Sequence, residues 1–298
     1  MGKIDPKAKK NAKPEPAKGK PAPAPSKALA TIPKAKPPAV KPSMAAMLEE
    51  DAGNNQGMNR DDLAIPRLQI LQALSPQVNT RDDGHVEGAE VGMIINNVDE
   101  SLYDGQEGFL ALVIAYRKAH LEWWPRDSKK GKGFVKDHGP DPSILLQTTR
   151  NDKGQNLTKD GTEIVPTGEY FIFILDEKQG TYEQALVSMA KAQLIKSKKL
   201  NTMMSTFMVD TAKGRKVAPF FYRTYKFATK PESNDKGNWF GWDITPGPTI
   251  DTLPNGESIY ADARAFLKNV EAGKVKVADP VADGDAGGGH AEGDDSPM

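Results

Sequence analysis

Two long apolar runs limit what this chain can fold into. Residues 109–116 read FLALVIAY and residues 169–175 read EYFIFIL. Apolar runs of this length, rich in aromatic and branched side chains, are typical of strands, and the unbroken first run predicts a strand that is buried on both faces. Residues 120–124 are expected to continue that first strand. The chain is therefore expected to be mainly β.

Shorter strand-like segments lie on either side of these two runs. Glycine, asparagine and aspartate connectors separate them at the spacing of an antiparallel barrel or sandwich. Residues 151–161 are polar and predict a hairpin connection, and residues 260–270 predict a helix that ends shortly before Gly273. The remaining predicted strands and extended segments are 68–71, 92–96, 143–149, 184–189, 219–227 and 238–244.

A second helix is expected over residues 191–208. Its apolar residues recur at the helical period and form a single stripe. These residues are Leu200, Met203, Met204, Phe207 and Met208. Lys191 and Lys198 fall almost opposite this stripe on a helical wheel, with Lys199 beside them. The helix should therefore pack on the barrel and present a basic ridge to water.

Both ends of the chain lack the apolar residues that a folded core needs. Residues 1–43 contain eleven lysines, ten prolines and two acids, a net charge of +9; residues 277–298 contain six acids and no lysine or arginine, a net charge of −6. Neither segment buries enough apolar surface to offset its conformational entropy, so both are expected to be disordered. Residues 44–60 predict a short helix and a hinge, which leaves 61–276 as a single globular domain.

Each end of the chain has two interpretations. The basic arm at 1–43 either touches a polyanion without reading its sequence or acts as a solubilising tail. The acidic tail at 277–298 either competes with DNA for a basic groove and recruits basic partners, or is likewise a solubilising tail. The residues between the ends, 44–276, carry 29 bases and 32 acids, a net charge of −3.

Several classes of protein find no support in the sequence. No apolar run approaches the roughly 20 residues of a membrane helix, and the N-terminus lacks the apolar region of a secretory signal. The absence of cysteine excludes disulfides and thiolate metal sites and favours a reducing compartment. The four histidines lack metal-binding spacing, and no dinucleotide or phosphate-loop motif occurs. We therefore expect a non-enzymatic protein without cofactor or metal.

The main chemical signal is positive charge interleaved with aromatic residues. Residues 191–230 contain ten bases and a single acid, Asp210, together with six phenylalanine and tyrosine residues. Residues 116–136 add seven bases, with Tyr116, two tryptophans and Phe134. Lysine and arginine neutralise phosphates, and exposed rings stack on unpaired bases without preferring a sequence, for roughly 1–3 kcal/mol per base. This combination favours binding of single-stranded DNA.

The competing interpretation places many of these rings in the core. Adjacent residues of a strand face opposite sides, so at most one of Trp123 and Trp124 is buried inside a barrel, and the same holds along 220–227. The lysines, in turn, are ordinarily a solvated face. The candidate nucleic-acid-binding residues are Lys118, Trp123, Trp124, Arg126, Lys129, Lys130, Lys191, Lys198, Lys199, Arg215, Lys216, Tyr222, Arg223, Tyr225, Lys226 and Trp239.

Three stretches of the chain resemble a family of tailed-bacteriophage early proteins. They are residues 62–76 (DLAIPRLQILQALSP), 188–204 (SMAKAQLIKSKKLNTMM) and 234–244 (NDKGNWFGWDI). That family is similar to the phage single-stranded-DNA-binding proteins of the replication region. The resemblance implies an elaborated OB-like antiparallel β-barrel, with insertions because the body is roughly twice a minimal OB-fold.

From these observations we expect a sequence-tolerant single-stranded-DNA-binding protein that supports phage DNA replication or recombination in the cytoplasm of the infected bacterial host. Its expected partners are single-stranded DNA and, through the acidic tail, replication or transcription proteins, with a homo-oligomer as a further option and no membrane contact. The tail ends in Ser296, Pro297 and Met298, whereas replication-protein tails of this kind finish in Phe. The alternative is a non-enzymatic, virion-associated structural protein or a transcription-accessory interaction protein.

Overall fold

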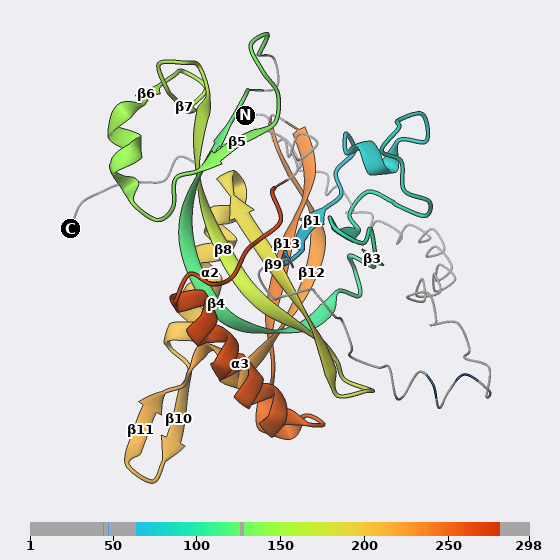
Figure 1. Cartoon of the computed structure of the whole chain (residues 1–298), viewed down its shortest axis with the longest axis vertical. Helices are drawn as coiled ribbons and strands as arrows, with labels where there is room; N and C mark the ends of the chain where they lie inside the picture. The colour runs from blue at the N-terminus through green and yellow to red at the C-terminus, as the bar shows by residue number, and fades with distance from the viewer. Residues whose placement is uncertain (1–43, 45–46, 48–63, 126–127, 236, 281–298) are drawn as a thin grey trace, which may run out of the picture. The chain divides into compact units, whose positions relative to one another are not determined.

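The computed structural model describes residues 44, 47, 64–125, 128–235 and 237–280, all within one unit, 32–298. A curled, half-barrel sheet of eleven strands forms its framework (Figure 1). The main path is β13-β12-β4-β8-β9-β1-β2-β3; β5 pairs with β4, and β6 pairs with β7, which pairs with β8. The strands are β1 (Arg67–Ile70), β2 (Ile94–Asn96), β3 (Leu102–Tyr103), β4 (Phe109–Trp123), β5 (Phe134–Asp137), β6 (Thr149–Arg150), β7 (Asn156–Leu157), β8 (Glu163–Asp176), β9 (Thr181–Ala190), β12 (Arg223–Asn234) and β13 (Gly237–Thr249).

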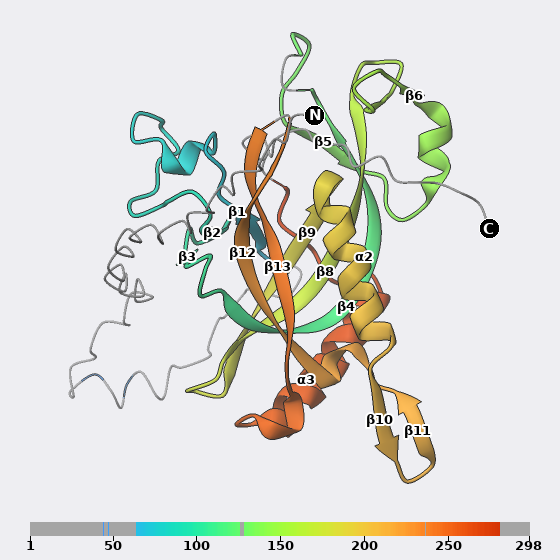
Figure 2. The ribbon, with the colours of Figure 1, turned by 180° about the vertical axis from the view of Figure 1, so that it is seen from behind.

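Two α-helices and five 3-10 helices accompany this sheet among the described residues, and a separate two-stranded sheet projects from it (Figures 1 and 2). The mainly β class with few helices is therefore confirmed. The separate sheet consists of β10 (Met208–Thr211) and β11 (Gly214–Val217). The helices are α2 (Leu194–Ser205), α3 (Gly256–Glu271), η2 (Pro76–Val78), η3 (Pro142–Gln147), η4 (Lys191–Gln193), η5 (Phe220–Tyr222) and η6 (Ile250–Thr252).

Strand β4 confirms that the run at 109–116 is a strand, and both of its faces are covered from Phe109 to Ala115, whereas Tyr116 is exposed. It continues without a break through the predicted extension at 120–124 as far as Trp123 and reaches 15 residues. Its register against β8 shifts between Val113 and Ala115, so that Ile114 is an extra residue in the pair. Such a bulge bends a strand and increases its twist. The bend of β4 is the strongest curvature of the sheet in Figure 1.

The inner face of the sheet, defined as the face that contacts α2, holds one hydrophobic core. Leu200 and Met204 of α2 belong to this core, together with Tyr170 and Ile172 of β8 and Val187 of β9. The Oη atom of Tyr170 on β8 lies 2.6 Å from Ser197 Oγ, which fixes the helix against the sheet. The predicted helix over 191–208 is confirmed in its centre, but α2 ends at Ser205, and Met208 already belongs to β10.

The outer face, which contacts α3, holds a second hydrophobic core. Ile259, Ala263 and Phe266 of α3 are buried against Phe171 and Phe173 of β8, among others. Gly273 follows the helix with a φ of +68°, a left-handed conformation that ends helices. The predicted helix over 260–270 is confirmed, and it begins earlier, at Gly256. Helices α2 and α3 thus cover opposite faces of the sheet.

Two sequence expectations of local structure were wrong, and one element was missed. The predicted strand at 143–149 is mostly the 3-10 helix η3, because Pro142 occupies its first turn and the Asp141 side chain accepts a hydrogen bond from Ser143 N at 2.9 Å. Residues 220–222 form η5, so the strand predicted from 219 begins only at Arg223. The hairpin of β10 and β11 was not anticipated.

The boundaries at the chain ends also differ from the expectation. The chain beyond α3 returns to β1: Ala278 N donates to Ile65 O, and Ile65 N donates to Lys276 O, each at 3.0 Å. Residues 277–280 are therefore held in the structure although their charge pattern assigned them to the acidic tail. Met44 and Met47 are helical, in agreement with the short helix predicted there. The arm at 1–43, the hinge and residues 281–298 lie outside the described residues.

A buried carboxylate links five segments on the outer side of the sheet. Glu169 of β8 has no exposed side-chain surface, and its two oxygens accept from Arg67 Nη1 at 2.6 Å and Arg117 Nε at 2.5 Å. Arg117 also reaches Asp137 of β5 at 2.9 Å, and Arg67 Nε donates to Ala278 O at 2.7 Å. The returning C-terminal segment is thus fixed through the same charged group that joins β1, β8 and β4.

We expect substitution Glu169→Ala to lower the free energy of unfolding by about 3–5 kcal/mol, because it leaves the buried Arg67 guanidinium without its carboxylate. Urea unfolding at pH 7 measures this loss. The matched control is Lys230→Ala, which removes an ion pair whose two side chains are about 45 % and 42 % exposed and should cost far less. Equal losses in the two variants would contradict the assignment.

Candidate nucleic-acid interface

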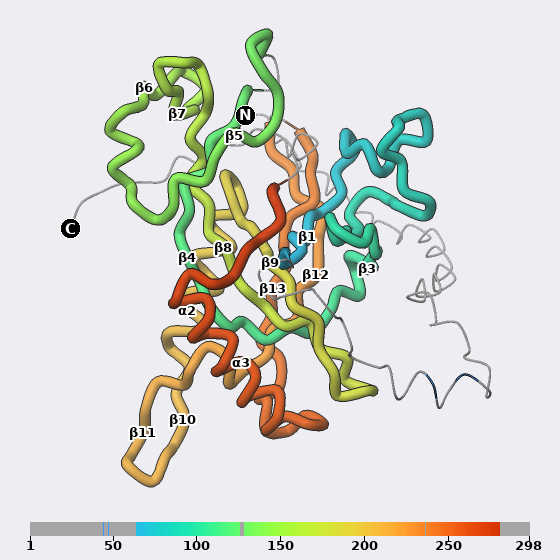
Figure 3. Tube along the Cα trace, in the orientation of Figure 1, coloured from blue at the N-terminus to red at the C-terminus, as the bar shows by residue number. Residues whose placement is uncertain are grey.

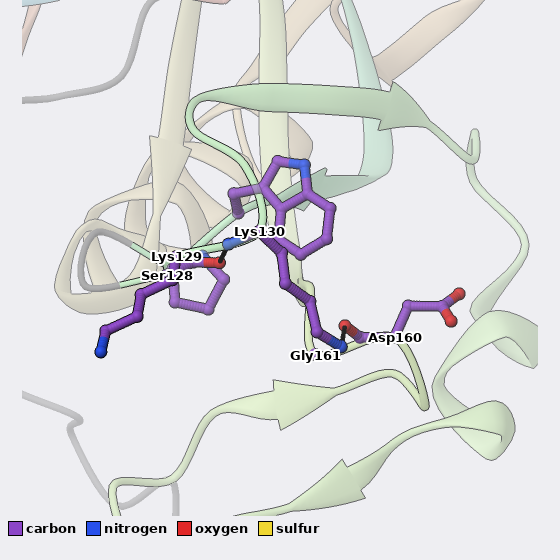
Figure 4. Close-up of a pocket in the computed structure, with 7 residues that line it drawn as sticks. Ser128, Lys129, Lys130, Asp160 and Gly161 are labelled. Carbon is purple, nitrogen blue, oxygen red and sulfur yellow. Dashed lines mark hydrogen bonds between the residues drawn. The ribbon is translucent and has the colours of Figure 1, made fainter.

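Several predicted interface residues meet in one pocket on the connection between β4 and β8. The pocket has a volume of about 350 Å³ and is shallow and open to solvent (Figure 4). We call it the Trp124 pocket. It is lined by Trp124, Pro125, Ser128, Lys129, Lys130, Asp160 and Gly161. It therefore combines a half-buried indole with two lysines, the residue types that stack on bases and neutralise phosphates.

The two lysines of the Trp124 pocket point in different directions. Lys130 Nζ donates to the Asp160 backbone oxygen at 3.1 Å, and Lys130 N donates to Ser128 Oγ at 3.1 Å. Lys129 extends away from these contacts into solvent (Figure 4). Lys130 consequently joins the two sides of the pocket, whereas the Lys129 ammonium is available to a phosphate.

Two glycines shape the loop that carries the indole. A Cβ atom at Gly131 would lie 2.4 Å from Trp124 Nε1, so the ring rests directly on the glycine backbone. Gly133 has a φ of +80°, and its carbonyl oxygen accepts from Trp124 N at 2.9 Å. A side chain at position 131 would displace the indole ring, so this close approach requires glycine. At position 133, glycine adopts the positive φ without strain. Trp123 packs edge-on against Phe134, with ring centroids 5.5 Å apart.

A carboxylate beneath this loop ties its ends together. Glu122 Oε2 lies 2.6 Å from His138 Nε2, and Glu122 Oε1 accepts from Thr162 Oγ1 at 2.5 Å. Burial acts to raise the pKa of Glu122, but the hydrogen bonds from Thr162 and His138 outweigh it, and the pKa lies below its usual value. The carboxylate thereby joins β4 to His138 after β5 and to Thr162, which directly follows Gly161 of the Trp124 pocket.

The predicted basic ridge on α2 is present in part. Lys198 and Lys199 are exposed on the solvent side of the helix, next to the exposed Ile195. Lys191 lies outside α2, in η4, with a φ of +49°, and its Nζ is 3.5 Å from Glu163 Oε2. Lys191 is therefore directed to a carboxylate of β8, and the ridge is limited to Lys198 and Lys199.

Arg215 and Lys216 lie on the hairpin of β10 and β11, which follows α2 after two residues. Tyr222 and Arg223, at the base of this hairpin, are engaged within the protein. The Arg223 guanidinium lies 4.7 Å from the centroid of the Phe207 ring, which is stacked on Tyr222 at 6.5 Å. Burial, with a contribution from Asp251, raises the pKa of Tyr222. These rings support the hairpin.

Four further predicted residues lie elsewhere. Tyr225 is 1 % exposed and belongs to the inner core, so the expectation that it stacks on a base is corrected. Trp239 is 9 % exposed, and its Nε1 donates to Glu232 at 3.1 Å. Lys226 pairs with Leu110 on the outer face, away from α2, whereas Lys118 pairs with Gly168 on the inner face. Arg126 lies outside the described residues.

Two groups of the predicted residues therefore lie at opposite ends of the sheet. The connection between β4 and β5, which carries most of the Trp124 pocket, lies at the top of the Cα trace near β5 and β7, and the β10–β11 hairpin projects at the bottom (Figure 3). Helix α2 leads from the upper part of the sheet down to the hairpin (Figure 2). The sequence clusters thus do not form one groove; they form a ring-containing pocket and a separate, mainly basic hairpin without aromatic side chains.

Sequence reasoning missed the residues that build the pocket. Gly131, Asp160 and the Glu122 hydrogen bonds shape it, but they come from segments up to 40 residues apart. Their only local signal was the glycine–lysine composition of residues 129–133. Pairing across a sheet, rather than spacing in sequence, brings them together.

Fold and site define a mainly β protein with a half-barrel sheet, an aromatic–basic pocket and a separate basic hairpin. A family model described as Pam3 phage gp34-like protein matches residues 34–276, and the chain belongs to this family. The bacteriophage origin expected from the three sequence stretches is thereby confirmed. Comparison with curated proteins and with solved structures gives no match. Within the described part of the chain, no helix is both long and apolar enough to span a membrane.

We expect Glu122→Gln to remove a stabilising contribution that depends on pH. Because the pKa of Glu122 is lowered by folding, its carboxylate stabilises the folded protein above the unfolded-state pKa, near 4.5, and loses this effect as the pH falls through the lower folded-state value. The difference in unfolding free energy between wild type and variant should therefore shrink between pH 5 and pH 3.

Urea unfolding followed by tryptophan fluorescence at several pH values measures that difference. The matched control is Glu87→Gln, since Glu87 is exposed and forms no ion pair with any described residue. A wild type and an E122Q variant that lose stability in parallel through the acid range would rule out the contribution.

Proposed function

We propose that this protein binds single-stranded DNA without sequence preference, in support of phage DNA replication or recombination. The observation that carries the proposal is the Trp124 pocket, in which a half-buried indole lies beside the solvent-directed Lys129. A ring that is open on one side offers a stacking surface to an unpaired base, and the adjacent ammonium neutralises its phosphate. Neither contact reads the identity of the base.

The order of the strands supports an elaborated OB-like barrel. In an OB-fold the first strand pairs with the second and the fourth, and the fifth strand pairs with the fourth. Strands β4, β8, β9, β12 and β13 follow this order, and α2 lies between the third and the fourth of them. In that correspondence the Trp124 pocket lies on the connection between the first two strands, one of the two loops with which OB-folds bind oligonucleotides.

The mechanism requires no cofactor and no chemical step. Phosphates of the bound strand are neutralised by Lys129 at the Trp124 pocket and by Lys198 and Lys199 on the solvent side of α2, and counterion release supplies part of the affinity. The acidic tail would engage replication or transcription proteins, and a homo-oligomer would extend the binding track. The host cytoplasm, where the phage genome is copied, is the place of action that this proposal implies.

A second candidate, a virion-associated or transcription-accessory interaction protein, is favoured by one observation. Leu146 of η3 is 88 % exposed, and no residue of η3 is buried. Leu146 follows Ile144 and Leu145, which are also not buried, and apolar side chains that cluster on a surface, rather than single ones, mark protein contacts. Under this candidate the substitution Leu146→Ser would abolish an assembly detected by sedimentation, and the protein would show no tryptophan quenching with DNA.

We expect Trp124→Leu to weaken the binding of a dT oligomer about tenfold, because one stacking contact of roughly 1–3 kcal/mol is lost. Affinity for a blunt duplex of equal length should change little, since paired bases offer no free face. Fluorescence quenching and gel shift at one salt concentration measure the two affinities.

The control for this experiment is Phe220→Leu, which removes another exposed ring (37 %) outside the pocket and should leave both affinities unchanged. If Trp124→Leu reduced duplex and single-strand binding equally, a stacking role for the indole would be untenable.

A second expected outcome concerns the ridge on α2. The double variant Lys198→Ala/Lys199→Ala removes up to two phosphate contacts, so the slope of log affinity against log salt for single strands should fall in magnitude by about 1.4. The melting temperature should stay constant, because both side chains are exposed and alanine favours helix. Lys178→Ala, at the exposed turn between β8 and β9, is the matched control. An unchanged slope would make the ridge an ordinary solvated face.

A further inference from the structure

The hairpin of β10 and β11 is separate from both hydrophobic cores. Its four residue pairs run from Met208–Val217 to Thr211–Gly214, and neither strand pairs with the main sheet. Every residue from 210 to 217 is exposed. A two-stranded ribbon of this kind contributes little to the stability of the sheet, so packing alone does not explain it.

The base of the hairpin is nevertheless firmly held. Ala218 N donates to Phe207 O at 2.9 Å, which continues the ladder below β10 and β11, and Ala218 itself is buried. The Phe207 ring is covered on its face by Arg223 and stacked on Tyr222. At the tip, Thr211 Oγ1 donates to Gly214 O at 2.7 Å, and Gly214 has a φ of +95°. The ribbon therefore projects in a fixed direction and is not a loose loop.

The exposed chemistry of the hairpin is cationic and contains no ring. The hairpin carries three cations and one acid, Asp210. The cations are Lys213, Arg215 and Lys216, and none of them forms an ion pair with a described residue. Residues 208–217 contain no aromatic side chain. Such a surface neutralises phosphates but cannot stack on a base, so an unpaired strand gains nothing over a paired one. Duplex DNA carries one charge per roughly 1.7 Å of axis, and its major groove admits a two-stranded ribbon.

We propose that the β10–β11 hairpin is a duplex-DNA contact, distinct from the single-strand site at the Trp124 pocket. The hairpin and the β4–β5 connection, which carries most of the Trp124 pocket, lie at opposite ends of the sheet in both views (Figures 1 and 2). The protein would then engage the double-stranded side of a junction with the hairpin and the single-stranded side with the pocket. The single-stranded side of this arrangement rests on the proposed function, whereas the duplex contact of the hairpin does not depend on it.

The test uses the full chain, with three labelled probes read by fluorescence anisotropy: a dT oligomer, a blunt duplex and a duplex with a single-stranded overhang. The triple variant Lys213→Ala/Arg215→Ala/Lys216→Ala should bind the duplex and the junction at least tenfold more weakly at 0.1 M salt. Its salt slope for the duplex should fall in magnitude by up to about 2.7, since each lost contact accounts for about 0.9. Its affinity for the dT oligomer should change less than twofold.

Two further variants make the result decisive. Lys178→Ala, on the exposed turn between β8 and β9, should leave all three affinities unchanged. Lys213→Ala alone removes one cation at the tip and should lower the duplex slope by about 0.9, which serves as the test if the triple variant is less stable.

Each outcome supports or overturns the inference separately from the proposed function. Wild-type duplex affinity in the triple variant overturns the duplex contact, as does an equal loss for the dT oligomer. A triple variant whose sedimentation shows a lost oligomer overturns it in favour of a contact between copies. If dT fails to quench tryptophan emission while the hairpin variant still loses duplex binding, the hairpin inference stands and the proposed single-strand function fails.

Discussion

The burial of β4 and β8 on both faces is the constraint on which the rest of the structure depends. A strand pair with apolar side chains on either side has no face left for water, so each face requires its own cover. Helix α2 covers the inner face, and α3 covers the outer face. Because α3 follows the last strand of the sheet, the outer core is complete only when the chain has reached the end of α3 at Glu271. The segment after α3 is then held beside β1 by hydrogen bonds with Ile65 and Arg67.

Much of this architecture follows from the sequence, and the exceptions have specific causes. Long apolar runs identified β4 and β8, and an apolar stripe at the helical period identified α2. Residues buried against a core are apolar and recur at the period of their element, so they leave a pattern in the sequence. The apolar pattern was misleading for η3, because Pro142 and the Asp141 side chain, which accepts a hydrogen bond from Ser143 N, determine the backbone conformation locally. It also failed for β10 and β11, which bury no face and so leave no periodic signal.

The candidate site was harder to predict because a charge cluster in sequence is divided by the fold. Tyr225 and Lys226 are neighbours, yet the pleat directs one into the inner core and the other to the outer face. Tyr222 and Arg223 looked available to a ligand, but they stack with Phe207 at the base of the hairpin. Trp124 and Lys129 were found because they share one short loop, where sequence proximity and spatial proximity coincide.

The near-neutral charge of the folded body does not conflict with binding of an anion. Residues 44–276 carry a net charge of −3, but exposed charges act over about a Debye length, roughly 10 Å at 0.1 M salt. Three lysines of the basic region are compensated by carboxylates: Lys191 by Glu163, Lys196 by Glu232 and Lys230 by Asp243. The cations left on the α2 ridge and the hairpin project from the body, so the potential that a phosphate meets there is set by them and by Asp210 rather than by the sum over the chain.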